Sequence, residues 1–429
     1  MFPRRARFVG LLVVSFSYRL YAQQPWADVV LVAHVRQTNR DLLQRLPLYT
    51  CLETISRGRP SGKNGKVKKQ DIVQVNVGVG AQEEMYSWPG ATSFSSEGLG
   101  ALIGHGLLST GMFQTFAANL FVFDQAIIKA AGEGVIDGRP MLRFTYSVPS
   151  LENHWDVDRF GSQGSLGEAG EFCVDRTDNT LVRLQVNATD IPATLPLKSL
   201  QVTVDYQRVS LDNKPELLPE SAEFSVLDTH GKSYRNAMVF SHCHVFEAES
   251  KMAASGDNLR AVFARYEANR GVLPSGITLQ VALETPVDAK NAKVGDAITA
   301  RLRKPLQIGP EMMVPQGATL RGRIREFERV EDSANTFVVG LEFDELNWSG
   351  HSYRFLATMI FSQPIAGLSS ALFSGHQSSR NVLDGTLFSS TTETLRASAI
   401  PGAATFFLKD VRALPKGFQM TWRTEQWAH

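Results

Sequence analysis

Cysteine is scarce in this chain, and neither sign of charge dominates. Only three cysteines, Cys51, Cys173 and Cys243, occur among 429 residues, and no two of them form a C-x-x-C pair. That spacing argues against thiol redox catalysis. Lys and Arg total 44 against 43 Asp and Glu, for a net charge of +1. The composition therefore indicates no nucleic acid or other highly charged partner.

Motifs that carry catalysis are missing as well. The sequence contains no G-x-S-x-G motif, no glycine-rich phosphate loop and no zinc signature. In HWDVD, Asp156 and Asp158 share a strand face, and paired carboxylates can perform acid–base chemistry. Such pairs are more often solvated residues of an edge strand. We therefore expect no catalytic residue, no cofactor and no metal site, and a secreted hydrolase is only the third interpretation.

Long apolar runs are absent after the N-terminus, where no stretch reaches the roughly 18 residues of a membrane helix. The first residues, MFPRRARFVGLLVVSFSYRLYAQQ, combine a basic start of Arg4, Arg5 and Arg7 with an apolar run that is too short to cross a bilayer. LYA then resembles a cleavage site that ends at Ala22. This pattern is typical of a secretory signal peptide over 1–22, and an uncleaved N-terminal anchor is the alternative. We expect a periplasmic or secreted protein.

What the sequence does contain is β-strand alternation, which follows a single helix. Apolar residues over 27–46 recur at helical intervals, and Pro47 ends that helix. The next stretch, LYTCLETISRG, alternates as a strand. Tyr49, Cys51, Glu53 and Ile55 fall on one of its faces.

Turn signals at regular spacing then predict an antiparallel meander. Asp137-Gly138 has the signature of a type I′ hairpin, and Asp212-Asn213 marks another turn. The glycine-rich, apolar segment 95–122 interrupts the meander. It predicts a helix, broken in places, that packs into the concavity of the sheet or over its mouth.

A second unit follows a helical pattern near residue 260. The motif of an apolar residue, Pro, any residue and Gly occurs in LPSGITLQV, VPQGATLRG and LPKGFQMTW, and predicts type I turns with Gly in the last position. We predict a mainly β (α+β) fold, a curved antiparallel half-barrel followed by a smaller β-barrel or sandwich. Its expected parts are a first domain over 23–252, a helical linker over 253–272 and a C-terminal domain over 273–429, with a flexible insertion over 362–400.

The three cysteines allow one disulfide in an oxidising compartment. Cys51 lies on the first strand and Cys243 near the end of the meander, so we favour a bridge between them and a free, buried Cys173. Other pairings, or no disulfide, are the alternatives. In FSHCHVF, His242 and His244 share a strand face opposite Cys243, but a metal site needs further ligands and none is nearby.

The first domain resembles the LolA/LolB-like superfamily of periplasmic lipoprotein carriers over about 25–250. The resemblance comes from the order of signal peptide, helix and meander, and from GEFCVDRTDNTLVRLQV and VDYQRV…LLPESAEF. It implies an unclosed barrel that holds acyl chains against an apolar concave face. The segment 95–122 departs from that simple pattern.

The C-terminal domain, over about 273–429, more weakly resembles the β-barrel of TrbI-type conjugation proteins. KVGDAITARL and VPQGATLRGRI carry the resemblance. It implies an assembly part of the cell envelope and not an enzyme.

Together these features predict an envelope protein that binds a lipid, a lipoprotein or another hydrophobic partner. A structural or assembly component without a small ligand is the alternative. The expected ligand contacts are the apolar residues of the helical segment, which are Leu102, Leu107, Met112, Phe113, Phe116, Phe121 and Phe123. We expect no nucleic-acid partner and at most a peripheral association with the membrane.

Overall fold

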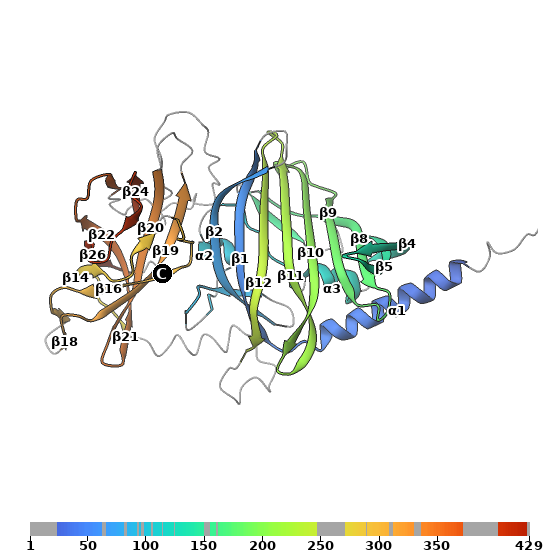
Figure 1. The fold of residues 1–429 in the computed structure, drawn as a ribbon, viewed down its shortest axis with the longest axis horizontal. Coiled ribbons are helices and arrows are strands. Elements are labelled where there is room, and N and C mark those ends of the chain that lie inside the picture. Colours follow the sequence, from blue (N-terminus) through green and yellow to red (C-terminus); the bar gives the residue numbers. More distant parts are fainter. Residues whose placement is uncertain are drawn as a thin grey trace, which may run out of the picture.

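The structure is a computed structural model of the chain (Figure 1). It describes residues 24–61, 66–80, 84–91, 94–95, 98–103, 106–113, 115–123, 125–149, 155–159, 162–246, 271–288, 290–308, 312–329, 336–371 and 402–426. The expected signal peptide, most of the expected linker helix and most of the expected insertion lie outside these residues, and the last two linker residues, Gly271–Val272, form a strand instead of a helix. Within the described ranges, no helix is long and apolar enough to cross a membrane.

Ten strands form the first sheet, in the order β3-β2-β1-β12-β11-β10-β9-β8-β5-β4. Figure 1 shows this sheet as a curved wall that wraps around the short helices. Every neighbouring pair is antiparallel, which confirms the predicted half-barrel. The strands are β1 (Tyr49–Ser61), β2 (Lys66–Val79), β3 (Glu84–Ser87), β4 (Ile127–Ile136), β5 (Arg139–Val148), β8 (Gly167–Asp175), β9 (Leu181–Thr189), β10 (Leu197–Leu211), β11 (Lys214–Asp228) and β12 (Ser233–Val245), while β6 (Asp156–Arg159) and β7 (Ser162–Ser165) pair separately.

The expected hairpins follow the turn residues. Asp137 and Gly138 have φ of 49° and 78°, and Asp212 and Asn213 have φ of 47° and 61°. Positive φ at both central residues is the mark of a type I′ turn, whose twist matches that of the flanking strands. These turns fix the register of β4 with β5 and of β10 with β11.

Helix α1 (Gln24–Gln44) packs across one end of the half-barrel, as Figure 1 shows. The Asn39 side chain is buried, donates to Asn179 O and accepts from Leu181 N–H. It therefore satisfies the backbone of the β8–β9 turn. Arg36 donates to Ala126 O at 2.6 Å, so polar contacts as well as apolar packing position the helix.

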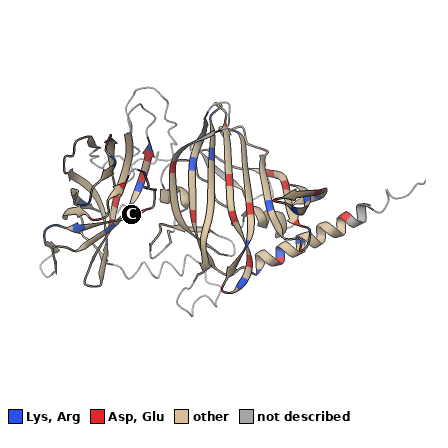
Figure 2. Ribbon diagram, in the orientation of Figure 1, with Lys and Arg blue, Asp and Glu red and all other residues tan. Residues whose placement is uncertain are grey.

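On the convex side, charged residues pair across neighbouring strands. Arg143 of β5 contacts Glu171 of β8 at 2.7 Å, and both side chains are more than 40% exposed. Figure 2 shows both signs of charge interspersed along these strands. Exposed pairs of this kind contribute little stability, so the concave face holds the sheet together.

The second sheet follows the order β13-β21-β20-β19-β16-β14-β26-β22, and β24 pairs with both β20 and β23. We call residues 271–426 the C-terminal sheet. Its strands are β13 (Gly271–Val272), β14 (Thr278–Leu283), β16 (Ala297–Leu302), β19 (Thr319–Arg329), β20 (Thr336–Trp348), β21 (His351–Arg354), β22 (Leu356–Ser362), β23 (Leu368–Ala371), β24 (Ala403–Lys409) and β26 (Gln419–Glu425), with β15 (Val287–Asp288) paired to β25 (Ala413–Leu414) and β17 (Leu306–Ile308) to β18 (Met312–Val314).

The three Pro-x-Gly turns differ from the expected type I turns. Gly276, Gly317 and Gly417 have φ of 85°, 87° and 85°. Ala318 N–H donates to Pro315 O, so the turn begins at the proline and the glycine is its third residue. A positive φ at that position belongs to a type II turn, which selects glycine. The turn positions predicted from the sequence are correct, but the predicted turn type is wrong.

The two sheets are joined through backbone hydrogen bonds. Val294 N–H donates to Ile72 O, and Gln74 N–H donates to Val294 O, each at 2.8 Å. Gly295 follows with φ of 99°, and a Cβ there would lie 2.2 Å from Gln74 O. Only glycine lets the C-terminal sheet approach β2 this closely.

An aromatic side chain adds to the same joint. Trp88 follows β3 and is buried. The guanidinium groups of Arg323 and Arg325 on β19 lie 5.6 and 5.2 Å from its ring centroid, within the range of cation–π attraction. Trp88 therefore ties the edge of the half-barrel to the C-terminal sheet.

Cys51 and Cys243 form the expected disulfide, which links β1 to β12. The β1–β12 register slips between Thr50 and Leu52, and His242 has φ of 53°. This is a β-bulge, in which an extra residue on one strand re-aims its neighbours. Cys173 is free and half-buried.

We predict that reduction destabilises the half-barrel selectively. The bridge joins residues 192 positions apart, and closing a loop of that length stabilises the folded state by about 5 kcal/mol in the chain-entropy account. Urea unfolding with and without reductant, followed by circular dichroism, measures the loss. The C-terminal sheet contains no cysteine and its transition should stay in place. Equal shifts of both transitions would contradict the prediction.

Candidate functional site

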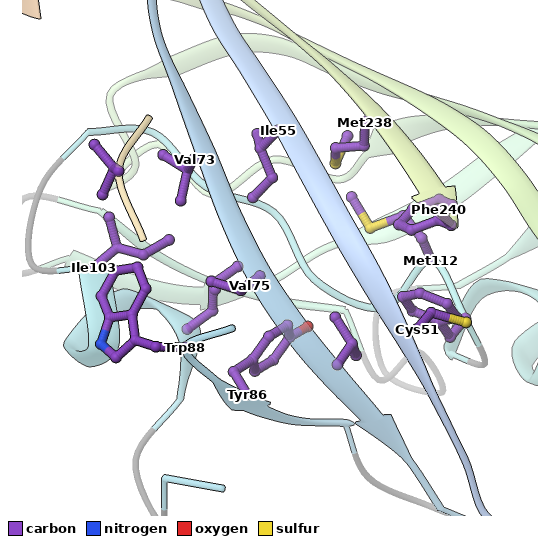
Figure 3. Close-up of a cluster of buried hydrophobic side chains, with 14 of the residues drawn as sticks. Cys51, Ile55, Val73, Val75, Tyr86, Trp88, Ile103, Met112, Met238 and Phe240 are labelled. Atoms are coloured by element: carbon purple, nitrogen blue, oxygen red, sulfur yellow. The ribbon is translucent and has the colours of Figure 1, made fainter. Parts of the chain in front are cut away.

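The concave face of the half-barrel is covered by residues 98–103, 106–113 and 115–123, which we call the plug. It contains α2 (Leu99–Ile103) and α3 (Thr115–Phe121), and residues 106–113 between them are not helical. Its most deeply buried apolar side chains are Leu99, Ile103, Met112, Phe113, Phe116, Leu120 and Phe121. Figure 3 shows Ile103 and Met112 among inward side chains of β1, β2 and β12.

The plug contacts the inner face of the sheet through aromatic rings. Phe113 lies 4.6 Å from Phe240 of β12, and Phe121 lies 5.4 Å from Phe172 of β8, measured between ring centroids. Both pairs are edge-to-face, an arrangement that adds attraction beyond the buried area. The plug thus fills the space that an apolar ligand would occupy.

The seven expected ligand contacts fall into three groups. Met112, Phe113, Phe116 and Phe121 are at most 2% exposed, while Leu102 and Leu107 are partly buried against the same core. Phe123 is 41% exposed. Four of the residues therefore lie deep in the interior, and whether any of the seven contacts a ligand stays a prediction.

Polar contacts to the plug are made mainly through its backbone. Asn236 of β12 donates to Leu107 O at 2.8 Å. Arg40 of α1 donates to Phe121 O at 2.9 Å, and Arg325 of the C-terminal sheet donates to Leu102 O at 3.0 Å. Each anchor comes from a different element, so the plug is fastened to β12, to α1 and to the second sheet.

Glu84 of β3 holds the middle of the plug. Its carboxylate accepts the N–H groups of Gly111 at 2.9 Å and Phe113 at 3.2 Å. It also accepts the hydroxyl of Tyr86 at 2.6 Å. We call residues 111–113 the tip of the plug.

Further polar side chains lie on the same inner face. We define Tyr49, Glu53, Glu84, Tyr86 and Tyr206 as the polar cluster. Apart from Glu84, which is partly exposed, each is at most 7% exposed. In the described part of the chain, the hydroxyls of Tyr49 and Tyr206 have no hydrogen-bond partner. Buried polar groups without partners are rare in folded proteins.

The cluster has a common electrostatic character. Burial, followed by the negative charge of Glu84, raises the pKa of the Glu53 carboxyl well above its ordinary value. The same two causes, in the same order, raise the pKa of the Tyr49 and Tyr206 hydroxyls. All of these shifts disfavour further negative charge in the interior.

Sequence reasoning did not single out the polar cluster. A signal was present, because Glu53 shares its strand face with Tyr49, Cys51 and Ile55, and a lone carboxyl on an apolar face is unusual. Glu84 gave no such signal, since its importance comes from contacts with Gly111 and Phe113.

The histidines of FSHCHVF do not form a metal site with the described residues. His242 and His244 are exposed, and His244 contacts the Thr50 hydroxyl at 3.1 Å. Among the described residues, no group of three potential metal ligands occurs.

Comparison with protein-family models gives no match, and comparison with curated proteins gives none either. Solved structures do show similarity. A LolA superfamily protein from Nitrosomonas europaea covers 54% of this chain and 96% of its own, at 7% identity and a TM-score of 0.28. A DUF1329 family protein from Desulfovibrio piger covers 51% and 95%, at 11% identity and a TM-score of 0.26.

A third structure is a domain from Vibrio parahaemolyticus, provisionally named an outer membrane lipoprotein-sorting protein. It covers 55% of this chain and 97% of its own, at 9% identity and a TM-score of 0.28. The similar structures thus include LolA superfamily and lipoprotein-sorting proteins, the kind that the first domain resembles in sequence pattern, while the TrbI-type resemblance stays an expectation. These likenesses concern the chain path alone, so what the interior binds has to be argued from its own residues.

We predict that Glu53→Gln removes a pH-dependent loss of stability. A carboxyl whose folded pKa is raised leaves the protein fully stable below its unfolded pKa, and stability falls as pH rises towards the folded pKa. The variant should match the wild type near pH 4 and exceed it at pH 8 in urea unfolding. Glu171→Gln, on the convex face, is the control. Parallel pH profiles for Glu53→Gln and the wild type would refute the prediction.

Proposed function

We propose that this protein is an exported, non-catalytic envelope protein that binds a hydrophobic ligand inside the half-barrel, in the space now taken by the plug. The ligand would be a lipid or the lipid part of a lipoprotein. The observation that carries the proposal is the plug itself, a separate segment that presents aromatic side chains to an apolar concave face.

The construction of the plug supports its displacement. Helices of 5 and 7 residues are too short to be stable alone, so the plug depends on its contacts with the sheet. An acyl chain could replace those apolar contacts, at about 25 cal/mol per Å² buried. The displaced aromatic residues could then cover the ligand.

Two further observations fit this role. The disulfide is typical of proteins that leave the reducing cytosol, in keeping with the expected signal peptide. The C-terminal sheet contacts the plug through Arg325, so a partner that docks on that sheet could influence the plug.

The filled interior also favours one alternative. A half-barrel packed permanently by its own side chains would be a structural or assembly component without a small ligand. The two functions differ in one measurable property, which is whether the plug gives way to an acyl chain.

We predict that loosening the plug increases lipid binding. In Asn236→Ala, the plug loses the hydrogen bond to Leu107 O. A buried acceptor left unsatisfied costs about 1–3 kcal/mol, and this partly buried carbonyl should cost the lower part of that range. The affinity for a long-chain lipid should rise about tenfold for each 1.4 kcal/mol. Native mass spectrometry of delipidated protein, titrated with phospholipid, measures it.

A matched control is Asn187→Ala, because Asn187 also donates its side-chain amide to a backbone carbonyl, that of Ala169 at 3.2 Å. That contact lies within the sheet, so lipid affinity should not change. Failure of the wild type and of Asn236→Ala to retain lipid would favour the structural alternative.

A further inference from the structure

The tip of the plug lies on the polar cluster. Phe113 donates its N–H to Glu84, and its ring lies 6.3 Å from Tyr49 and 4.6 Å from Phe240. Phe240 pairs directly with Glu53 across β1 and β12, and both side chains are buried on the inner face. Removing the tip would therefore uncover Glu84, Tyr49 and the region around Glu53 together.

The tip offers Glu84 two N–H donors from one tight turn. Gly111 has φ of 93°, a conformation that glycine adopts without strain. With the tip withdrawn, Glu84 would lose these two donors and keep the hydroxyl of Tyr86. A ligand that takes the place of the tip and brings N–H donors of its own would restore the two lost hydrogen bonds at this partly exposed carboxylate.

The other residues of the polar cluster restrict which head group such a ligand can have. The hydroxyls of Tyr49 and Tyr206 can each donate or accept one more hydrogen bond. Glu53 and Glu84 place two carboxyl groups at the site, so an anionic head group would meet repulsion. The cluster has only two carboxyl groups, and among the described residues no group of three His, Cys, Asp or Glu side chains could hold a metal ion. Aromatic rings and carboxylates together suit an ammonium group, which gains cation–π attraction as well as hydrogen bonds.

We propose, building on the proposed function, that the half-barrel binds lipids with a primary amine, whose ammonium group replaces the tip of the plug at Glu84 and Glu53 between the rings of Tyr49 and Tyr206. Three N–H donors on one nitrogen satisfy Glu84 and leave one for Glu53 or a tyrosine hydroxyl. The acyl chain follows the apolar path that Phe113 and Phe116 now occupy.

The proposed binding of an ammonium group also predicts that a proton is released. Burial and the negative charge of Glu84 raise the pKa of the Glu53 carboxyl, and an incoming ammonium lowers that pKa again. At a pH between the two pKa values, binding therefore releases a proton from Glu53 to solvent, and the ion pair forms between the carboxylate and the ammonium. The release depends on an ionisable side chain at position 53 and is absent when glutamine stands there.

The test compares two ligands that differ only in the head group, dodecylamine and dodecanol, by isothermal titration calorimetry on the full chain. We expect the wild type to bind the amine at least tenfold more tightly and to release a proton, seen as a dependence of the heat on the buffer. Glu53→Gln should lose most of the tenfold preference for the amine over dodecanol and release no proton. Glu171→Gln should behave as the wild type.

Phosphatidylethanolamine and phosphatidylglycerol with identical acyl chains extend the comparison to bilayer lipids, by native mass spectrometry. Preference for the amine in both pairs supports the inference. Equal binding within each pair overturns it and leaves the proposed function standing, whereas absence of binding by all four ligands overturns both. An amine preference that survives in Glu53→Gln and in Glu84→Gln also overturns the inference, because it would arise elsewhere.

Discussion

Filling the concave face is the constraint on which the rest of the structure depends. A strongly curved antiparallel sheet turns a broad apolar surface inward, and protein interiors tolerate few voids. Here the plug supplies the missing layer, with Phe113 and Phe121 set edge-to-face against Phe240 and Phe172. The sheet and the plug each need an apolar partner opposite, and the proposed exchange of the plug for another apolar occupant would keep the concave face covered.

Other features would hold the curved sheet in shape during such an exchange. The disulfide fastens β1 to β12 beside a β-bulge, and Gly295 lets the C-terminal sheet bond directly to β2. Trp88 and Arg325 extend that joint to the start of the plug. The half-barrel is therefore a rigid frame, whereas the plug is held to it at only a few points. The proposed ligand binding requires both properties.

Features with a local cause were predictable from the sequence. The alternation over Tyr49–Ile55, the hairpin at Asp137-Gly138 and the cysteine pairing each follow from neighbouring residues or from a small number of combinations. The type of the Pro-x-Gly turns was misjudged because type I and type II turns both accept these residues, and the glycine φ decides between them.

Long-range contacts were beyond sequence reasoning. Glu84 acquires its role from Gly111 and Phe113, more than 25 residues away, and nothing in its local pattern marks it. Likewise, the plug was recognised as a helical segment near the concavity, but its anchors on Asn236, Arg40 and Arg325 depend on the assembled fold. The polar contacts at the candidate site therefore form only when the strands have paired in their native register.

Hydrogen exchange measured by mass spectrometry on the ligand-free protein tests the central claim most directly, because local opening lets a segment exchange without global unfolding. The account predicts that amides of the plug, those of Gly111 and Phe113 included, exchange through an opening that leaves β10 and β11 protected, and that bound lipid changes the plug's exchange far more than that of those strands. Plug amides that exchange only together with β10 and β11, with or without lipid, would show that the plug is a permanent part of the core and would contradict the account.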